Sequence, residues 1–162
     1  MKNMRLKFLF LICAGLTAAA SASAQVQCTL ALDAAKPLKA GDHVTAKLNV
    51  EIDPGWHISS LTTPDNGPLR SEIALPKGSP CKLAGKIEAP KPRREHSKAF
   101  DVDVETYEGA VEFTVPLEAT QDLAVGSKIV VEFTYQACND ETCNLPKTYK
   151  AEATVGLRVD AK

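Results

Sequence analysis

The chain has 162 residues, of which 44% are hydrophobic and 24% are charged. This composition is typical of a globular protein and excludes a disordered or collagen-like chain. The formal net charge of −1 excludes a strongly basic protein of the kind that nucleic acid attracts through its overall field.

The first 24 residues have the three regions of a secretory signal peptide. The basic region contains Lys2, Arg5 and Lys7. An apolar run over residues 8–20 follows, and the small residues at 22–24 form a cleavage signal. The apolar run of about 13 residues is shorter than the ~20 that a transmembrane helix needs. We therefore expect cleavage after Ala24 and an exported chain, residues 25–162, that does not insert into a membrane.

Removal of the signal peptide changes both the charge and the cysteine count. Residues 1–24 hold three of the 19 basic residues and none of the 20 acidic ones, so the exported chain has a net charge near −4. It therefore lacks the positive field that would attract nucleic acid or anionic lipid. Cys13 is lost, which leaves Cys28, Cys81, Cys138 and Cys143. An even number of cysteines in an exported chain predicts disulfides.

Strand periodicity dominates the exported chain. Between residues 44 and 52, apolar and polar residues alternate, so that one set of side chains faces a core and the other faces water. The predicted strands cover residues 29–32, 44–52, 56–59, 72–75, 82–87, 100–104, 111–117, 129–135 and 149–159. Residues 89–94 contain two prolines and are predicted to form an extended, solvated loop.

Eight or nine short strands, separated by Gly, Pro and Asp and without a convincing amphipathic helix, predict an all-β protein. The best fit is an immunoglobulin-like β-sandwich. No repeat or internal boundary divides residues 25–162, and we expect a single domain.

Cys138 and Cys143 enclose a polar stretch of four residues between two strongly periodic strands. This spacing predicts a β-hairpin with one cysteine on each arm. Facing positions of a hairpin can reach the Cα separation of about 5.5 Å that is typical of disulfides. Cys28 and Cys81 then remain as a second pair, although four cysteines allow three connectivities.

The two predicted bridges differ in the length of the loop that each would close. A Cys28–Cys81 bridge would close about 54 residues and stabilise the fold by roughly 4 kcal/mol in the chain-entropy model. A Cys138–Cys143 bridge would close about six residues and contribute roughly 2 kcal/mol. The longer bridge is therefore the better candidate for a structural disulfide, and the shorter one is more easily opened.

Two other interpretations of the cysteines stay open from the residues alone. Both bridges could be inert in a stapled β-sandwich that binds a protein partner. Alternatively, the reduced pair Cys138 and Cys143 could bind Cu(I) or zinc with a histidine, the candidates being His43, His57 and His96. The three histidines show no ligand spacing, however, and we expect neither a metal nor an organic cofactor.

Three stretches resemble the N-terminal periplasmic domain of DsbD, the membrane thiol:disulfide reductase. The most specific is residues 133–146, which resemble the redox hairpin of that domain. The others are residues 54–60, with Trp56 and His57, and residues 107–116. The resemblance extends over nearly all of the exported chain.

The resemblance implies an immunoglobulin-like periplasmic domain that relays electrons through a reversible dithiol/disulfide. Such a domain receives electrons from a thioredoxin-like domain of its membrane reductase and passes them to thioredoxin-like periplasmic proteins. Carried over, Cys143 is the nucleophile that forms the mixed disulfide, and Cys138 is its resolving partner. The family's reductase continues into a membrane domain and a thioredoxin-like domain, so this chain is expected to receive electrons from a separate membrane protein.

The resemblance also implies a cap loop with an aromatic residue that shields the active cysteines. Phe100 with Asp101 is the nearest match, and Tyr135 is a further candidate. Both aromatic residues also fit the apolar face of a predicted strand, where they would pack in the core. We expect a monomer in the periplasm.

Overall fold

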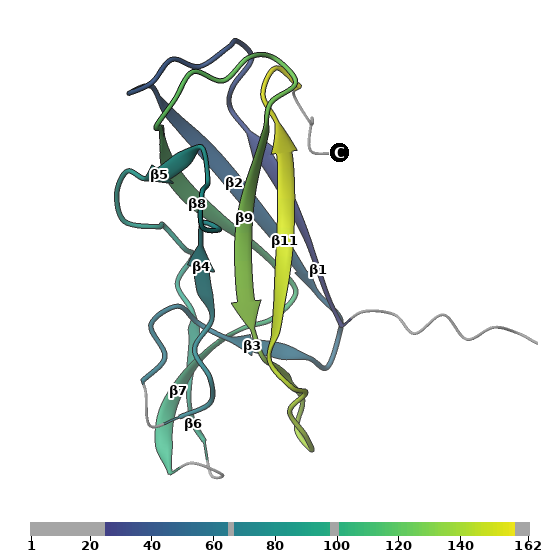
Figure 1. Cartoon of the computed structure of the whole chain (residues 1–162). Helices are drawn as coiled ribbons and strands as arrows, with labels where there is room; N and C mark the ends of the chain where they lie inside the picture. The colour runs from purple at the N-terminus through teal and green to yellow at the C-terminus, as the bar shows by residue number, and fades with distance from the viewer. Residues whose placement is uncertain (1–24, 65–66, 98–100, 158–162) are drawn as a thin grey trace, which may run out of the picture.

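The structure is a computed structural model that describes residues 25–64, 67–97 and 101–157 (Figure 1). This part of the chain contains eleven strands and no helix. The strands are β1 (Val26–Leu32), β2 (His43–Ile52), β3 (His57–Ser59), β4 (Glu72–Ala74), β5 (Cys81–Leu83), β6 (Arg93–Ser97), β7 (Val102–Tyr107), β8 (Ala110–Ala119), β9 (Lys128–Tyr135), β10 (Ala137–Cys138) and β11 (Lys147–Thr154). Consistently, no described segment is a helix long and apolar enough to cross a membrane.

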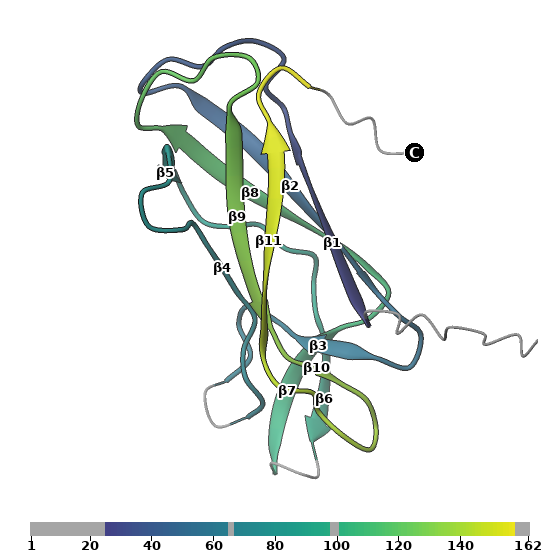
Figure 2. The same ribbon diagram turned by 45° about the vertical axis from the view of Figure 1, so that its right-hand side comes forward.

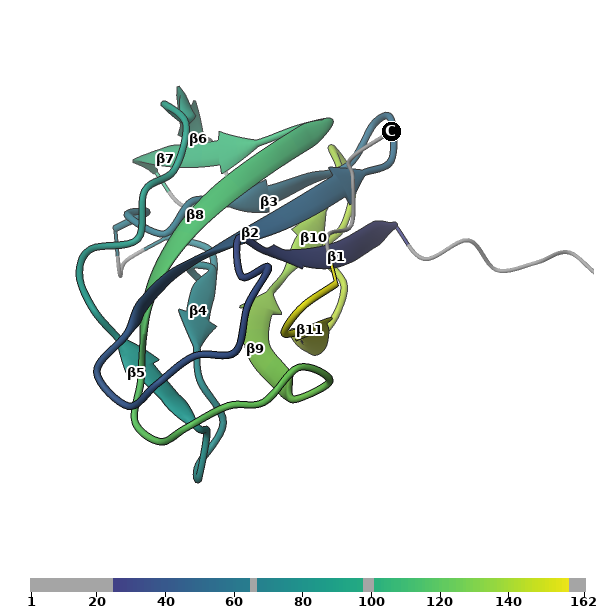
Figure 3. The same cartoon turned by 90° about the horizontal axis from the view of Figure 1, so that it is seen from above.

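The strands form three antiparallel sheets. Their strand orders are β1-β2-β8-β5, β11-β9-β4 and β10-β3-β7-β6. The first two sheets face each other as the layers of a sandwich, which Figure 3 shows from above. The predicted immunoglobulin-like β-sandwich is therefore confirmed.

The core between the two layers follows from the alternation in the sequence. Strand β2 alternates between exposed and buried side chains along its whole length, and Leu48 is fully buried. Phe113 of β8 and Phe133 of β9 are also fully buried, and their ring centroids lie 5.7 Å apart across the core. Burying side chains of this size contributes roughly 1.5–3 kcal/mol each, so the facing apolar stripes hold the layers together.

The third sheet lies at one end of the sandwich and carries the candidate site. Figure 2 shows β10, β3, β7 and β6 side by side below the long strands. Its inner face joins the core through Ala137, Ile58 and Tyr107, which are paired across β10, β3 and β7. The opposite face of this sheet carries Cys138, Ser59 and Thr106, which are also largely buried.

The strands predicted over residues 82–87 and 149–159 end earlier, at Leu83 and Thr154, and one further segment differs in kind. Residues 89–94 were expected to form a loop, but Arg93 and Arg94 begin the edge strand β6. The side chains of β6 are mainly charged and half-buried or exposed, so the strand has no apolar stripe in its sequence. It forms because its backbone pairs with β7 from Arg93↔Thr106 to Ser97↔Val102.

Candidate functional site

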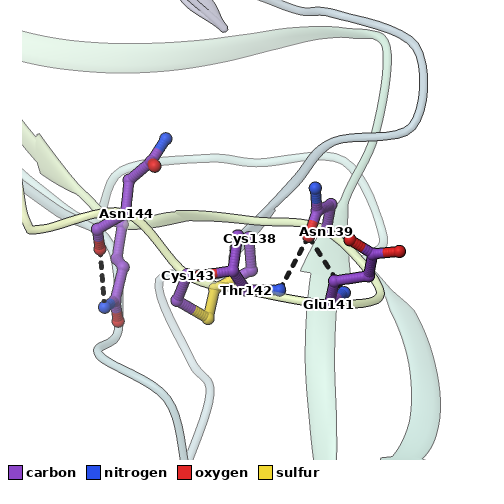
Figure 4. The surroundings of a disulfide bond; sticks show 7 residues. Cys138, Asn139, Glu141, Thr142, Cys143 and Asn144 are labelled. Carbon is purple, nitrogen blue, oxygen red and sulfur yellow. Dashed lines mark hydrogen bonds between the residues drawn. A yellow bond between two sulfur atoms is a disulfide. The ribbon is translucent and has the colours of Figure 1, made fainter.

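A disulfide joins Cys138 and Cys143 at the end of the third sheet (Figure 4). The S–S distance is 2.04 Å and the two Cα atoms are 4.0 Å apart. Cys138 ends β10, and the two cysteines face each other as an isolated antiparallel pair. The predicted hairpin and its short-range disulfide are confirmed.

Asn139 holds the turn between the two cysteines. Its side-chain Oδ1 accepts hydrogen bonds from the backbone N–H groups of Glu141, at 3.0 Å, and Thr142, at 2.8 Å (Figure 4). Its own N–H donates to the Thr142 carbonyl oxygen at 2.9 Å. This arrangement is an Asx turn, in which a side-chain oxygen stands in for a backbone carbonyl. The turn is therefore fixed by its own residues.

The base of the hairpin is also fixed. The Asn144 N–H donates to the Ala137 carbonyl oxygen at 2.8 Å, and Gln136 Nε2 donates to the Asn144 carbonyl oxygen at 2.9 Å. Hydrogen bonds therefore lie on both sides of the disulfide. This framework does not depend on the S–S bond, so the hairpin has other contacts that hold its two arms when the bond opens.

The two cysteines differ in their exposure to solvent. Cys138 is only 5% exposed, although it lies outside the main core cluster. Cys143 is exposed. Thiol–disulfide exchange begins with attack on one sulfur of the bond and depends on access to that sulfur. The geometry therefore favours attack at Cys143, with the sulfur of Cys138 as the leaving group.

A cavity of about 750 Å³ lies beside the disulfide, and we call it the disulfide cavity. Both cysteines line it, together with Val104 and Thr106 of β7. Pro68, from the segment between β3 and β4, lines it as well. The cavity therefore lies between the cysteine hairpin, the β6–β7 hairpin and a loop that are far apart in sequence.

Carboxylates surround the disulfide cavity. Asp140 and Glu141 are exposed in the turn beside Cys143, and neither has an ion pair with a described residue. Glu95 lies 3.2 Å from Arg93, which also binds Glu108 at 2.9 Å. The exposed sulfur therefore lies in mainly acidic surroundings.

The predicted Cys28–Cys81 disulfide is wrong: both cysteines are free and buried. Cys28 lies on β1 and Cys81 on β5, which are the two opposite edges of one sheet. Three strand spacings separate these edges, about 14 Å. A disulfide allows at most about 7 Å between Cα atoms. Burial raises the pKa of the Cys28 thiol to about 12 and also raises that of Cys81, so both are held as thiols.

The three cap candidates have different outcomes. Phe100 lies outside the described residues. Asp101 is exposed at the β6–β7 turn, with a φ of 55°, and its Oδ1 lies 3.4 Å from Nε2 of His96. Asp101 is thus on the hairpin beside the disulfide cavity. Tyr135 is not a cap residue, because it is 5% exposed in the core and stacks on Phe133 with ring centroids 5.2 Å apart.

The histidines lie in different places. His43 begins β2, whereas His57 follows the far end of that strand and lines the disulfide cavity with His96 of β6. Within residues 25–64, 67–97 and 101–157, no three His, Cys, Asp or Glu side chains form a group that could hold a metal.

Two residues of the site were not placed there by the sequence analysis, which named His57 only as a candidate metal ligand and within a resembling stretch. His57 is paired with Cys138 across β3 and β10, 81 positions apart in sequence, and nothing in the local sequence indicates this. Leu145, two positions after Cys143, is 84% exposed. Lys147 interrupts the apolar alternation between Leu145 and Tyr149. This break was the available signal that Leu145 lies outside the core.

Comparisons with known proteins agree with this geometry. The family model described as thiol:disulfide interchange protein DsbD, N-terminal, matches residues 25–155. No curated protein matches the chain.

Two solved structures are similar to this chain. The N-terminal domain of DsbD from Neisseria meningitidis, in its reduced form, is 14% identical, with a TM-score of 0.48 over 77% of this chain and 83% of that one. The N-terminal periplasmic domain of ScsB from Proteus mirabilis is 16% identical, with a TM-score of 0.53 over 80% of this chain and 45% of that one. At these identities, the likeness to ScsB supports the fold and carries no assignment of activity.

Proposed function

This chain belongs to the family of N-terminal domains of the thiol:disulfide interchange protein DsbD, and from that membership we propose that it relays electrons between periplasmic proteins. The relay uses the Cys138–Cys143 pair as a reversible disulfide. It needs no organic cofactor, because the two sulfurs carry the two electrons.

The unequal exposure of the two cysteines carries this proposal. An inert hairpin bridge has no need for one open and one covered sulfur, whereas an exchange protein needs an accessible sulfur to meet its partner and a protected one to resolve the mixed disulfide. Cys143 is exposed and Cys138 is 5% exposed. Cys143 is therefore assigned as the nucleophile and Cys138 as the resolving cysteine.

The accepting half-reaction reduces the hairpin. A thiolate of the reduced donor attacks Cys143 Sγ, the Cys138–Cys143 bond breaks, and its electron pair leaves on Cys138 Sγ. The donor's second thiol then attacks the donor sulfur bound to Cys143. The donor is left as a disulfide, and this protein holds two thiols.

The donating half-reaction runs in the opposite direction. The Cys143 thiolate attacks a disulfide of the acceptor and forms a mixed disulfide with it, while the other acceptor sulfur leaves as a thiol. Cys138 then attacks Cys143 Sγ, which closes the hairpin disulfide again. The acceptor departs with two thiols, so two electrons have passed through the hairpin.

The surface around Cys143 is the proposed docking site for both partners. Leu145 offers an apolar contact next to the reactive sulfur, and the disulfide cavity provides a recess beside it. Leu145 is 84% exposed and lies two positions after Cys143, so a partner that reaches the sulfur can also contact its side chain. We propose thioredoxin-like periplasmic proteins as acceptors and a membrane thiol reductase as donor, with the protein acting as a periplasmic monomer.

Single-cysteine variants test the relay. Cys143→Ser should abolish disulfide exchange, because no accessible nucleophile remains. Cys138→Ser should accumulate a mixed disulfide between Cys143 and a thioredoxin-like protein, detected by non-reducing electrophoresis and mass spectrometry. Cys81→Ser is the matched control, since this buried free cysteine lies on the far sheet edge and its loss should leave exchange unchanged.

The redox potential of the hairpin disulfide provides the measurement that could refute the relay. Structural disulfides typically have potentials below about −300 mV. A value in that range, together with a Cys138→Ser variant that traps no partner, would refute the relay. The protein would then be a disulfide-stapled binding domain.

A further inference from the structure

The proposed relay places a negative charge on a buried sulfur. When Cys143 is attacked, the electron pair of the broken bond leaves on Cys138 Sγ, and Cys138 is only 5% exposed. Burial disfavours a thiolate, and nearby carboxylates disfavour it further. Asp140 and Glu141 both line the cavity beside this sulfur. Opening the bond is therefore easier if a neighbouring group delivers a proton to Cys138.

His57 is the neighbour that strand pairing places beside Cys138. The two residues are direct partners in the β10–β3 register. Such cross-strand partners have Cβ atoms about 4.5–5.5 Å apart and point to the same side of the sheet. Ala137 and Ile58, the adjacent pair, face the core, so Cys138 and His57 face the opposite side. Both residues line the disulfide cavity on that side.

The imidazole of His57 is uncommitted. It is half-buried, and it has no hydrogen bond or ion pair with another described residue. His96 lines the same cavity but is engaged: its Nδ1 lies 3.2 Å from Asp103 and its Nε2 lies 3.4 Å from Asp101. The cavity is therefore lined by His96, which carboxylates hold, and by His57, whose imidazole is available to contact the sulfur of Cys138.

The charged groups around His57 are mostly acidic. His57 also lines a second cavity, of about 630 Å³. The titratable and charged side chains of the two cavities are Asp53, Arg93, Glu95, His96, Glu108, Asp140 and Glu141. Carboxylates from the β2–β3 turn, β6, the β7–β8 turn and the cysteine hairpin thus outnumber the one arginine, which is itself paired with Glu95 and Glu108. The charged groups that face His57 are therefore mainly carboxylates.

We propose that His57 is the general acid and base of the relay: it transfers a proton to Cys138 when the disulfide opens and takes the proton back when the disulfide closes. This role rests on the proposed function. As the partner thiolate forms its bond to Cys143 Sγ, the leaving Cys138 sulfur receives the proton of the His57 imidazolium. The products are a Cys138 thiol and a neutral imidazole. In the resolving step the neutral imidazole accepts that proton, and the Cys138 thiolate attacks Cys143 Sγ.

The pH dependence of disulfide opening tests this role without any partner protein. The measurement is the rate of reduction of the oxidised exported chain by dithiothreitol, divided by the fraction of dithiothreitol present as thiolate. In the wild type, this corrected rate constant should fall about tenfold between about pH 5.5 and about pH 8.5, as the imidazolium loses its proton. In His57→Gln and His57→Asn it should not vary with pH and should match the wild-type value at high pH.

His96→Gln is the matched control, because it removes the other histidine of the same cavity. It should keep the pH dependence of the wild type. The proposal is overturned if His57→Gln and His57→Asn retain that dependence, or if His96→Gln loses it. Thermal unfolding of the oxidised variants identifies any that is misfolded. If one of the two variants at position 57 is misfolded, the pH dependence of the other tests the proposal. Failure to exchange with thioredoxin-like proteins would refute the relay itself, whereas an unchanged pH profile would refute only the role of His57.

Discussion

Full reduction of residues 25–162 should lower their free energy of unfolding by about 2 kcal/mol, because Cys138–Cys143 is the one disulfide formed among the described residues. The bridge from Cys138 to Cys143 spans a sequence separation of 5. In the chain-entropy model, a closed loop of about six residues contributes roughly 2 kcal/mol at 25 °C. A second bridge between Cys28 and Cys81, closing about 54 residues, would add roughly 4 kcal/mol, for a total near 6. The two connectivities therefore differ by a factor of about three in this measurement.

Urea denaturation with and without reductant measures this difference, and alkylation under denaturing conditions counts the thiols. Two cysteines should be alkylated before reduction and four after it, since Cys28 and Cys81 are free. A Cys138→Ala/Cys143→Ala double variant should show no response to reductant. A loss of more than about 4 kcal/mol on reduction, or the absence of any thiol in the unfolded oxidised protein, would refute the assignment of free cysteines.

Three smaller predictions concern residues near the site and in the core. Asn139→Ala removes the two hydrogen bonds to Oδ1 that hold the turn, and it should lower the stability of the oxidised protein by about 1–2 kcal/mol in urea denaturation; Asn144→Ala, whose hydrogen bonds use the backbone, should have little effect. Burial raises the pKa of Cys28 from 9.0 to about 12 in the folded protein. The folded state therefore keeps a proton that the unfolded state loses above pH 9, and the free energy of unfolding should fall from pH 9 towards pH 12. This fall should be less steep in Cys28→Ala. Thr106 Oγ1 is buried without a hydrogen-bond partner among the described residues, and Thr106→Val should raise the melting temperature. Thr63→Val should lower it by contrast, because Thr63 is as deeply buried but its hydroxyl donates to the Glu105 carbonyl oxygen at 2.6 Å.

The features predicted correctly from the sequence are those that depend on neighbouring residues. The alternation between residues 44 and 52 predicted β2 almost to its ends, because a strand has a period of two wherever it lies in the fold. The hairpin disulfide was predicted for the same reason, since only four residues separate Cys138 from Cys143 and a hairpin brings its own arms together. The edge strand β6 was missed, because its charged residues carry no apolar period.

The sequence by itself therefore determined the class of fold, the positions of the long strands and the disulfide hairpin, which are all encoded over short stretches of chain. Only the tertiary structure decided which strands are neighbours. The order β1-β2-β8-β5 puts Cys28 and Cys81 on opposite edges and leaves them unlinked. The order β10-β3-β7-β6 brings His57 beside Cys138 and leaves Cys143 open to solvent. Strand order is set by how the apolar faces of distant segments pack together, and the local sequence around a cysteine contains no record of that packing.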